Sequence, residues 1–176
     1  MKNYYGDQGK TFLFSNEKVD KDSVRVEAIG AVDEFNSVIG LARSKIEDKE
    51  LDDVLKRVQQ QVFAIGSDIA TSIGTKKVYR VAEKEVEEIE ALIDNYNKDL
   101  PKLKNFILPS GTELSAMMQV CRSVCRRAER RVVSLSKHEE VNIKTVTFLN
   151  RLSDFFFVLA RYVNMKSGSE EEMRYD

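Results

Sequence analysis

The apolar residues of this chain recur three and four positions apart over most of its length, which restricts the fold more than any other feature. This spacing places apolar side chains on one face of an α-helix and leaves the opposite face to water. It predicts five amphipathic helices, and the apolar positions that define them fall at residues 32–46, 51–69, 86–96, 114–135 and 146–163.

Composition supports helices and a single domain. The 176 residues contain only 8 glycines and 2 prolines, too few for the frequent turns of a sandwich or barrel, so an all-β fold is excluded. The length is that of one domain, and 42% hydrophobic residues suffice for a core. Short polar breaks at 47–50, 74–77, 97–111 and 137–142 connect the helices. We therefore predict an all-α, five-helix antiparallel bundle over residues 1–176.

The two ends of the chain differ from the predicted helices. Residues 1–22 carry turn-forming residues and no helical periodicity, which predicts an N-terminal loop. Residues 167–176 are polar and acidic, which predicts a frayed tail. Ser110 and Glu113 stand at capping-box spacing, and Ser110 is predicted to cap the fourth helix.

Several functional classes are disfavoured. The net charge of −1 gives no global attraction to nucleic acid, and the longest purely apolar run, residues 155–160, is far too short to span a membrane. Cys121 and Cys125 cannot form a disulfide framework, and no histidine and cysteine cluster could ligate a metal. We therefore predict a cytoplasmic protein that has no metal-ligand set of its own.

An arginine-rich segment is the most unusual part of the sequence, with five arginines among residues 122–131. On a helix, Arg122, Arg126 and Glu129 share a face, and Arg130 lies one turn further on. Planar guanidinium groups repeated along one helix suit a polyphosphate ligand. A solvated charged face is the alternative.

Two other predicted helices carry polar residues at helical spacing. Asp33 stands with Asn36, Ser37 and Gly40 on the first helix, and it could pair with an arginine of the fourth, within the subunit or across an oligomer interface. A surface acid is an equally good interpretation. Asn150 and Asp154 interrupt an otherwise apolar fifth helix, as structural hydrogen bonders or ligand contacts.

A turn near the N-terminus combines small residues, a carboxylate, a lysine and a hydroxyl. Its residues are Gly6, Asp7, Gln8, Gly9, Lys10 and Thr11. The glycine–lysine spacing is too short for a Walker motif, so alone it is a weak indication of a phosphate-binding loop.

These segments, in this order, resemble the PduO-type ATP:cob(I)alamin adenosyltransferases. The similarity rests on residues 6–11, 21–27, 30–37, 106–109, 122–130 and 148–154. It implies a homotrimeric five-helix bundle with active sites between subunits. The implied reaction transfers the 5′-deoxyadenosyl group of ATP to the cobalt of cob(I)alamin and releases triphosphate, with magnesium and an electron-donating reductase as partners.

The resemblance also implies a role for each matching residue. Arg126 would bind the ATP phosphates with Lys10, Lys21 and Mg²⁺, and Glu129 would orient that site. Asn150 would contact the nucleotide, and Gly6, Asp7, Gly9 and Thr11 would belong to its loop. Arg122 would pair with Asp33 of the neighbouring subunit. Phe106 would crowd the lower face of the corrin so that the axial base leaves cobalt.

The chain departs from the family pattern at the N-terminus, where Asn3, Tyr4 and Tyr5 stand in place of a basic residue between threonines. Ser110, Gln119 and Lys18 are further departures. They motivate a second hypothesis, a catalytically weakened homologue that binds corrinoid or ATP for delivery or sensing. A third, an arginine-rich helix that binds RNA, ranks last because of the net charge of −1.

Overall fold

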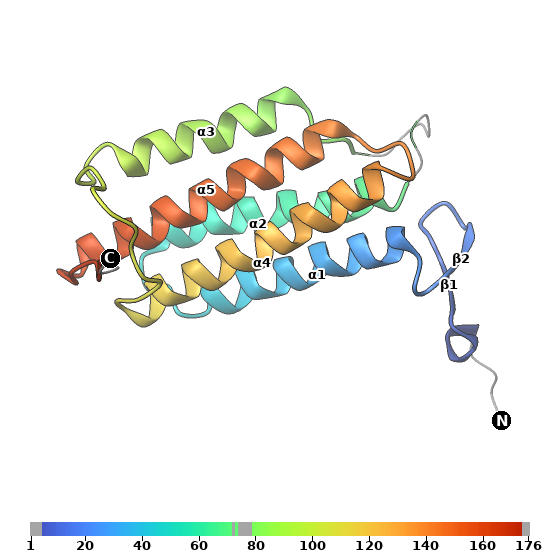
Figure 1. Cartoon of the computed structure of the whole chain (residues 1–176), viewed down its shortest axis with the longest axis horizontal. Helices are drawn as coiled ribbons and strands as arrows, with labels where there is room; N and C mark the ends of the chain where they lie inside the picture. The colour runs from blue at the N-terminus through green and yellow to red at the C-terminus, as the bar shows by residue number, and fades with distance from the viewer. Residues whose placement is uncertain (1–4, 72, 74–78, 174–176) are drawn as a thin grey trace.

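The protein was analysed as a computed structural model that describes residues 5–71, 73 and 79–173. A short 3-10 helix η1 (Tyr5–Gln8) and two strands, β1 (Lys10–Phe12) and β2 (Lys18–Asp20), precede the helices. The helices are α1 (Val24–Arg43), α2 (Lys49–Ile69), α3 (Glu83–Asn97), α4 (Glu113–Ser136) and α5 (Ile143–Lys166). The predicted all-α, five-helix bundle is confirmed (Figure 1).

The helices pack in the order α2, α1, α4, α5, α3, so the arginine-rich α4 lies between α1 and α5. Neighbouring helices run antiparallel except α3 and α5, which run in the same direction (Figure 1). Among the described helices, none is long and apolar enough to cross a membrane.

The core contains the predicted apolar faces. Phe35 of α1 and Phe148, Phe155 and Phe156 of α5 are fully buried. The rings of Phe35 and Phe156 meet edge to face, with centroids 5.7 Å apart, a favoured arrangement of aromatic rings. The aromatic residues of α5 therefore form a large part of the core.

One buried carboxylate ties three elements together. Asp68 near the end of α2 accepts hydrogen bonds from the Val81 amide (3.1 Å), from Asn142 Nδ2 (2.8 Å) and from Arg80. Asn142 is also the N-cap of α5. Because a buried carboxylate needs partners, these contacts fix the segment before α3 and the start of α5 to the end of α2.

The N-terminal segment is more ordered than the sequence indicates. Instead of a simple loop, β1 and β2 form an antiparallel hairpin in which Lys10 pairs with Asp20 and Thr11 with Val19. Strands of three residues are too short for a periodicity-based prediction. Asn3 and Tyr4, which depart from the family pattern, lie outside the described residues, and so does the predicted polar break at 74–77.

Two sequence predictions at helix ends are corrected. The N-cap of α4 is Thr112, whose hydroxyl accepts from the Ser115 amide (3.2 Å), whereas Ser110 is two residues upstream. The tail does not fray over residues 169–173: Arg161 donates to Glu171 (2.6 Å), and the Leu108 amide donates to the Glu172 carbonyl (2.8 Å). The acidic composition of the tail suggests a solvated segment, and it does not show that a buried arginine of α5, Arg161, binds one of its glutamates.

Candidate functional site

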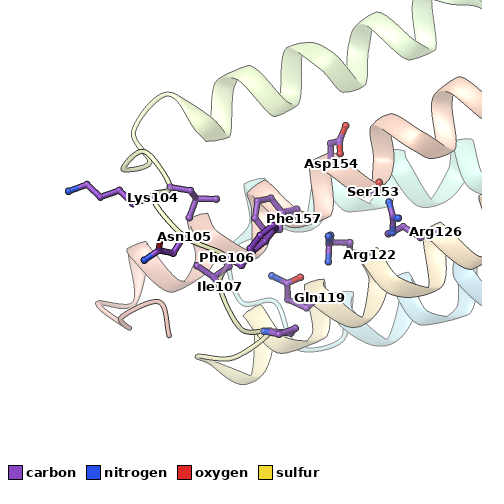
Figure 2. A pocket seen from close by; sticks show the side chains of 12 residues that line it. Lys104, Asn105, Phe106, Ile107, Gln119, Arg122, Arg126, Ser153, Asp154 and Phe157 are labelled. Atoms are coloured by element: carbon purple, nitrogen blue, oxygen red, sulfur yellow. The ribbon is translucent and has the colours of Figure 1, made fainter. Parts of the chain in front are cut away.

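A cavity of about 600 Å³ opens between α4, α5 and the loop that connects α3 to α4 (Figure 2). It is large enough for an organic ligand, and its wall combines aromatic and aliphatic side chains with a few polar groups, as binding sites usually do. The lining residues are Leu103, Lys104, Asn105, Phe106, Ile107, Pro109, Gln119, Arg122, Arg126, Ser153, Asp154 and Phe157.

Arg122 and Arg126 reach this cavity from successive turns of α4. The Arg122 guanidinium lies over the Phe157 ring, 5.2 Å from its centroid, and this cation–π contact orients it. Arg126 is exposed at the cavity wall. Within the described chain, neither arginine has an ion pair with a carboxylate. The cavity therefore presents two positive charges to a ligand.

The arginines on the adjoining face of α4 have a different role. Arg127 pairs with Glu34 (2.6 Å) and Arg131 with Glu27 (3.1 Å), both on α1. These exposed pairs hold α1 against α4 and leave neither guanidinium in the cavity. The arginine run is thus divided into a packing face and a ligand-facing face, as the helical spacing predicts for Arg122 and Arg126.

Glu129 and Asn150 lie together across the α4–α5 contact. Asn150 Nδ2 donates to Glu129 Oε1 (3.1 Å), and the Arg151 guanidinium donates to Asn150 Oδ1 (3.1 Å). Arg151 is itself held by Glu90 of α3 (2.7 Å), a hydrogen bond that raises the pKa of Arg151. Glu129 is one turn from Arg126, so this network places a carboxylate and an amide beside the ligand-facing arginines.

Phe106 projects from the loop before α4 and is 80% exposed, yet it lines the cavity. An aromatic ring so exposed gains little from packing in its own chain. Figure 2 shows it beside Phe157, opposite the α4 wall that carries Gln119 and Arg122. Its ring is therefore accessible from the cavity.

The hairpin gathers most of the predicted nucleotide-loop residues. The Gly9 carbonyl accepts from the Lys21 amide (2.8 Å), and Gly9 has a φ of 70°, which favours glycine. A Cβ added at Gly6 would lie only 3.2 Å from Lys21 Nζ, so the glycine permits the lysine's approach. Lys10 pairs with Asp20 across the hairpin.

Two further residues of the predicted loop belong to this segment: Asp7 lies in η1 and is exposed, and Thr11 lies in β1. The hairpin, however, projects beyond one end of the bundle (Figure 1), and none of the predicted loop residues lines the cavity at Arg126. Within a single chain, the predicted nucleotide loop therefore does not meet the predicted phosphate-binding arginines.

Asp33 is likewise separate from Arg122. It is exposed on α1 and lines a different hollow of about 330 Å³ with the exposed Phe14 and Phe63. Asn36 lines the same hollow, and its Oδ1 is buried with no hydrogen-bond partner among the described residues. Within the described residues Asp33 has no ion pair with an arginine of α4, so a pair inside the subunit is excluded, and a pair across an oligomer interface and a surface acid remain as interpretations.

Gln119, Ser153 and Phe157 are among the cavity residues that sequence reasoning did not select as site residues. Gln119 precedes Arg122 by three positions and Arg126 by seven, which places all three on one face of α4. Extending the arginine face by one turn would have found it. Phe157 was obscured because its neighbours Phe155 and Phe156 belong to the core.

The two cysteines of α4 face the core and not the cavity. Burial raises the pKa of the Cys121 thiol to about 12 and that of Cys125 well above its ordinary value. Cys125 Sγ donates to the Leu149 carbonyl (3.2 Å). Both thiols therefore remain protonated and act as small packing groups, as the sequence predicts.

Comparisons with known proteins agree with this geometry. Residues 2–163 match the family model described as cobalamin adenosyltransferase. The corrinoid adenosyltransferase of Bacillus subtilis is 42% identical over 167 residues, covering 93% of this chain and 86% of the relative. The human corrinoid adenosyltransferase MMAB is 39% identical over 175 residues, which cover 96% of this chain and 70% of the human protein.

Solved structures also match over nearly the whole chain. A variant PduO-type ATP:corrinoid adenosyltransferase from Lactobacillus reuteri, complexed with cobalamin and ATP, superposes with a TM-score of 0.93 at 36% identity and covers 98% of this chain and 97% of that one. Another variant of that enzyme, complexed with ATP, also has a TM-score of 0.93, and the match covers 99% of this chain and 100% of the other.

Proposed function

The chain belongs to the cobalamin adenosyltransferase family, and on that premise we propose that it transfers the 5′-deoxyadenosyl group of ATP to the cobalt of a reduced corrinoid and releases triphosphate. One observation carries the proposal for this chain: Arg122 and Arg126 present unpaired positive charge on the wall of a partly apolar cavity of about 600 Å³. That wall combines an apolar surface for a macrocycle with a cation, Arg126, for a polyphosphate, while Arg122 remains for a partner from outside the chain.

The chemistry requires positioning more than a protein nucleophile. Cob(I)alamin supplies the attacking electron pair, so the protein must hold C5′ in line with cobalt and stabilise the charge that develops on the departing triphosphate. We assign the second task to Arg126, with Lys10 and Lys21 contributing from the hairpin. Glu129 and Asn150 orient this end of the site through their mutual hydrogen bond, with Asn150 facing the nucleotide.

We propose that the active protein is a homotrimer whose sites lie between subunits. Two observations on the single chain support this: the hairpin and Arg126 do not share a cavity, and Arg122 has no carboxylate partner among the residues that the structure describes. Asp33 of one subunit would pair with Arg122 of the next. The hollow at Asp33, with its exposed Phe63 and the unpaired Oδ1 of Asn36, would then be covered by the neighbouring subunit.

Magnesium fits this site as a companion of the ATP triphosphate. Among the described residues there is no cluster of three or more metal-ligating side chains. Mg²⁺ is often held by one or two carboxylates together with substrate phosphates, and Glu129 is the carboxylate nearest in sequence to Arg126 on their shared face. When bound, the ion would neutralise charge on the triphosphate.

Phe106 would exclude the axial base from the lower face of the corrin. Its ring is exposed and lines the cavity, so it can occupy space next to a bound macrocycle. Loss of the axial base makes Co(II) easier to reduce, and an electron-donating reductase would supply the electron. A reducing cytoplasm is consistent with two buried, unpaired cysteines.

The test is an assay with ATP, Mg²⁺ and chemically reduced cobalamin that follows both the absorbance change on adenosylation and the release of triphosphate. The wild-type chain should produce one triphosphate per cobalamin consumed. A homologue that only binds would show affinity for ATP or cob(II)alamin by calorimetry without either product, and that result would refute the proposed activity.

Matched variants connect the assay to the site. Arg126→Ala should lower kcat/KM about 10²- to 10³-fold, the usual cost of removing a preorganised charge contact in a catalytic site. Arg127→Lys is the control, because it retains the charge that pairs with Glu34 outside the cavity. Near-normal turnover by Arg126→Ala would contradict the role given to Arg126.

A further inference from the structure

The cavity contains a buried amide that the proposed reaction does not yet use. Gln119 is only 6% exposed, and it lines the cavity one turn before Arg122 on α4. Figure 2 shows its side chain on the α4 wall, across from the loop that carries Phe106 and Ile107. The backbone carbonyl of Gln119 accepts from Ser123 (3.0 Å), so its backbone is already satisfied by the helix.

The side-chain amide of Gln119 has no such partner. Among the described residues, no group hydrogen-bonds to it, although neither of its polar atoms is sealed inside the protein. A largely buried amide without a hydrogen-bond partner is unfavourable, and Gln119 lines the cavity, where a ligand could supply that partner. Ser153, buried on the α5 side of the same cavity, adds a hydroxyl to its wall.

We propose that Gln119 binds a peripheral carboxamide of the corrin macrocycle, and so sets the rotation of the ring in the site and selects amidated corrinoids over those that carry a carboxylate at that position. The inference rests on the proposed function and extends it to substrate selection. It assigns Gln119 a positioning and specificity role, while the charge chemistry stays with Arg126.

Amide complementarity gives the physical reason. A glutamine amide can donate from Nε2 to a ligand carbonyl and accept at Oε1 from the ligand NH₂, which gives both of its polar atoms a partner at once. A carboxylate at the same position has no N–H to donate, so Oε1 would remain unpaired and would face a negative charge. Sites that hydrogen-bond a ligand group strongly reject analogues that lack it.

The charged residues near Gln119 allow selection by its amide to be distinguished from selection by charge alone. Arg122, three positions along α4, attracts a carboxylate, whereas Asp154 on the α5 wall repels one. A selection made by Gln119 must therefore disappear when only its amide is removed and both charges stay. Gln119→Met meets that condition because methionine keeps the length of the side chain and loses the hydrogen-bonding groups.

The first measurement compares Gln119→Met with the wild type and with Gln61→Met. Gln61 is the matched control, since its amide donates to Glu88 (3.2 Å) between α2 and α3, away from the cavity. Gln119→Met should raise KM for reduced cobalamin, and the calorimetric Kd for cob(II)alamin in the presence of ATP, about 5- to 100-fold. KM for ATP should stay within about twofold, and Gln61→Met should match the wild type.

The second measurement tests selection directly with cobalamin monocarboxylic acids, in each of which a single peripheral amide is hydrolysed. The wild type should bind one of them at least about tenfold more weakly than cobalamin, and Gln119→Met should bind that acid and cobalamin equally. Gln119→Glu, which keeps an acceptor and adds charge, should reject the acid more strongly than the wild type does.

Three results would overturn the inference: a wild type that does not distinguish the acids from cobalamin, a Gln119→Met protein that keeps the wild-type preference, or a Kd for cob(II)alamin unchanged in that variant. The wild-type measurement stands even if a variant does not fold. Failure of the proposed function differs from all three, because the wild type would then form no adenosylated product.

Discussion

A mixture of two inactive variants should recover activity if the site is shared between subunits. Asp33 is exposed on α1, and Arg122 lies over Phe157 in a cavity to which Asp33 does not belong. The proposed pair therefore requires two chains. Asp33→Asn removes the carboxylate, and Arg122→Met removes the charge while keeping an apolar group against Phe157.

Each variant alone should lose most of its activity. Removing one member of a charge pair that becomes buried at an interface costs about 2–5 kcal/mol, much of it from the charge left without a partner. At about 1.4 kcal/mol per factor of ten, the loss is roughly 30-fold or more in whichever step depends on the closed interface. Asp33→Asn should weaken association between subunits, and Arg122→Met should also raise KM for the corrinoid.

The recovery follows from the symmetry of a closed ring of three chains. Every interface takes Asp33 from one chain and Arg122 from the next. If the two variants mix randomly in equal amounts, half of the chains supply an intact Asp33 and half supply an intact Arg122, so about one quarter of the interfaces are wild type in both. Activity should follow the product of the two mole fractions and be greatest at equal mixing.

The assay co-expresses the variants with different affinity tags, isolates the mixed oligomers by two successive purifications, and measures adenosylation of reduced cobalamin against separately purified and remixed proteins. Sedimentation fixes the number of chains. No recovery at any ratio, with both variants folded and mixed, would refute the shared site, because a pair formed within one chain cannot be rebuilt by mixing.

Three further predictions concern stability and reactivity. Asp68→Ala should destabilise the fold by about 3–5 kcal/mol and lower Tm by about 10 °C, since it leaves the partners of a buried carboxylate unpaired; a calorimetric Tm within about 2 °C of the wild type would contradict this. Cys121 and Cys125 should resist a thiol reagent at pH 8 in the folded protein and react in urea, because burial raises both pKa values; rapid labelling of folded protein would show that they are accessible. The hydrogen bond from Arg43 lowers the pKa of Asp52 below 3.8, so its stabilising contribution is present above that pH and is lost as the pH falls through the lowered value; the urea midpoint of Asp52→Asn should therefore lie below the wild type at pH 6 and converge with it in acid, and a constant difference would be inconsistent with the linkage.

The helices were predictable because their signal is local and repeated. The apolar positions at 51–69 correspond to α2, which spans Lys49–Ile69, since every turn of a two-faced helix restates the same pattern. The helix ends were less predictable. Ile46 continues the apolar spacing of α1, but the helix ends at Arg43, because the chain must turn there to reach α2.

The hairpin and the docked tail depend on contacts that no short window of sequence contains. β1 and β2 have three residues each, and the Arg161–Glu171 bond joins a core helix to a segment whose composition alone suggests a solvated tail. Tertiary contacts decided both. Helical spacing predicted the shared face of Arg122 and Arg126. Gln119 lies on the same face, but its side chain carries no charge and was therefore not selected from the sequence.

The division of the arginines explains why a single chain carries an incomplete site. Arg127 and Arg131 form ion pairs with carboxylates of α1, whereas Arg122 and Arg126 face a cavity, and within the described chain neither is paired with a carboxylate. Two guanidinium groups on successive turns repel each other, and the helix tolerates this because packing on the opposite face supplies its stability. An interior carboxylate would remove the repulsion, but it would also compete with a triphosphate for the same donors. Placing the compensating Asp33 on another subunit satisfies Arg122 without occupying the phosphate site, and leaves Arg126 available to the leaving group.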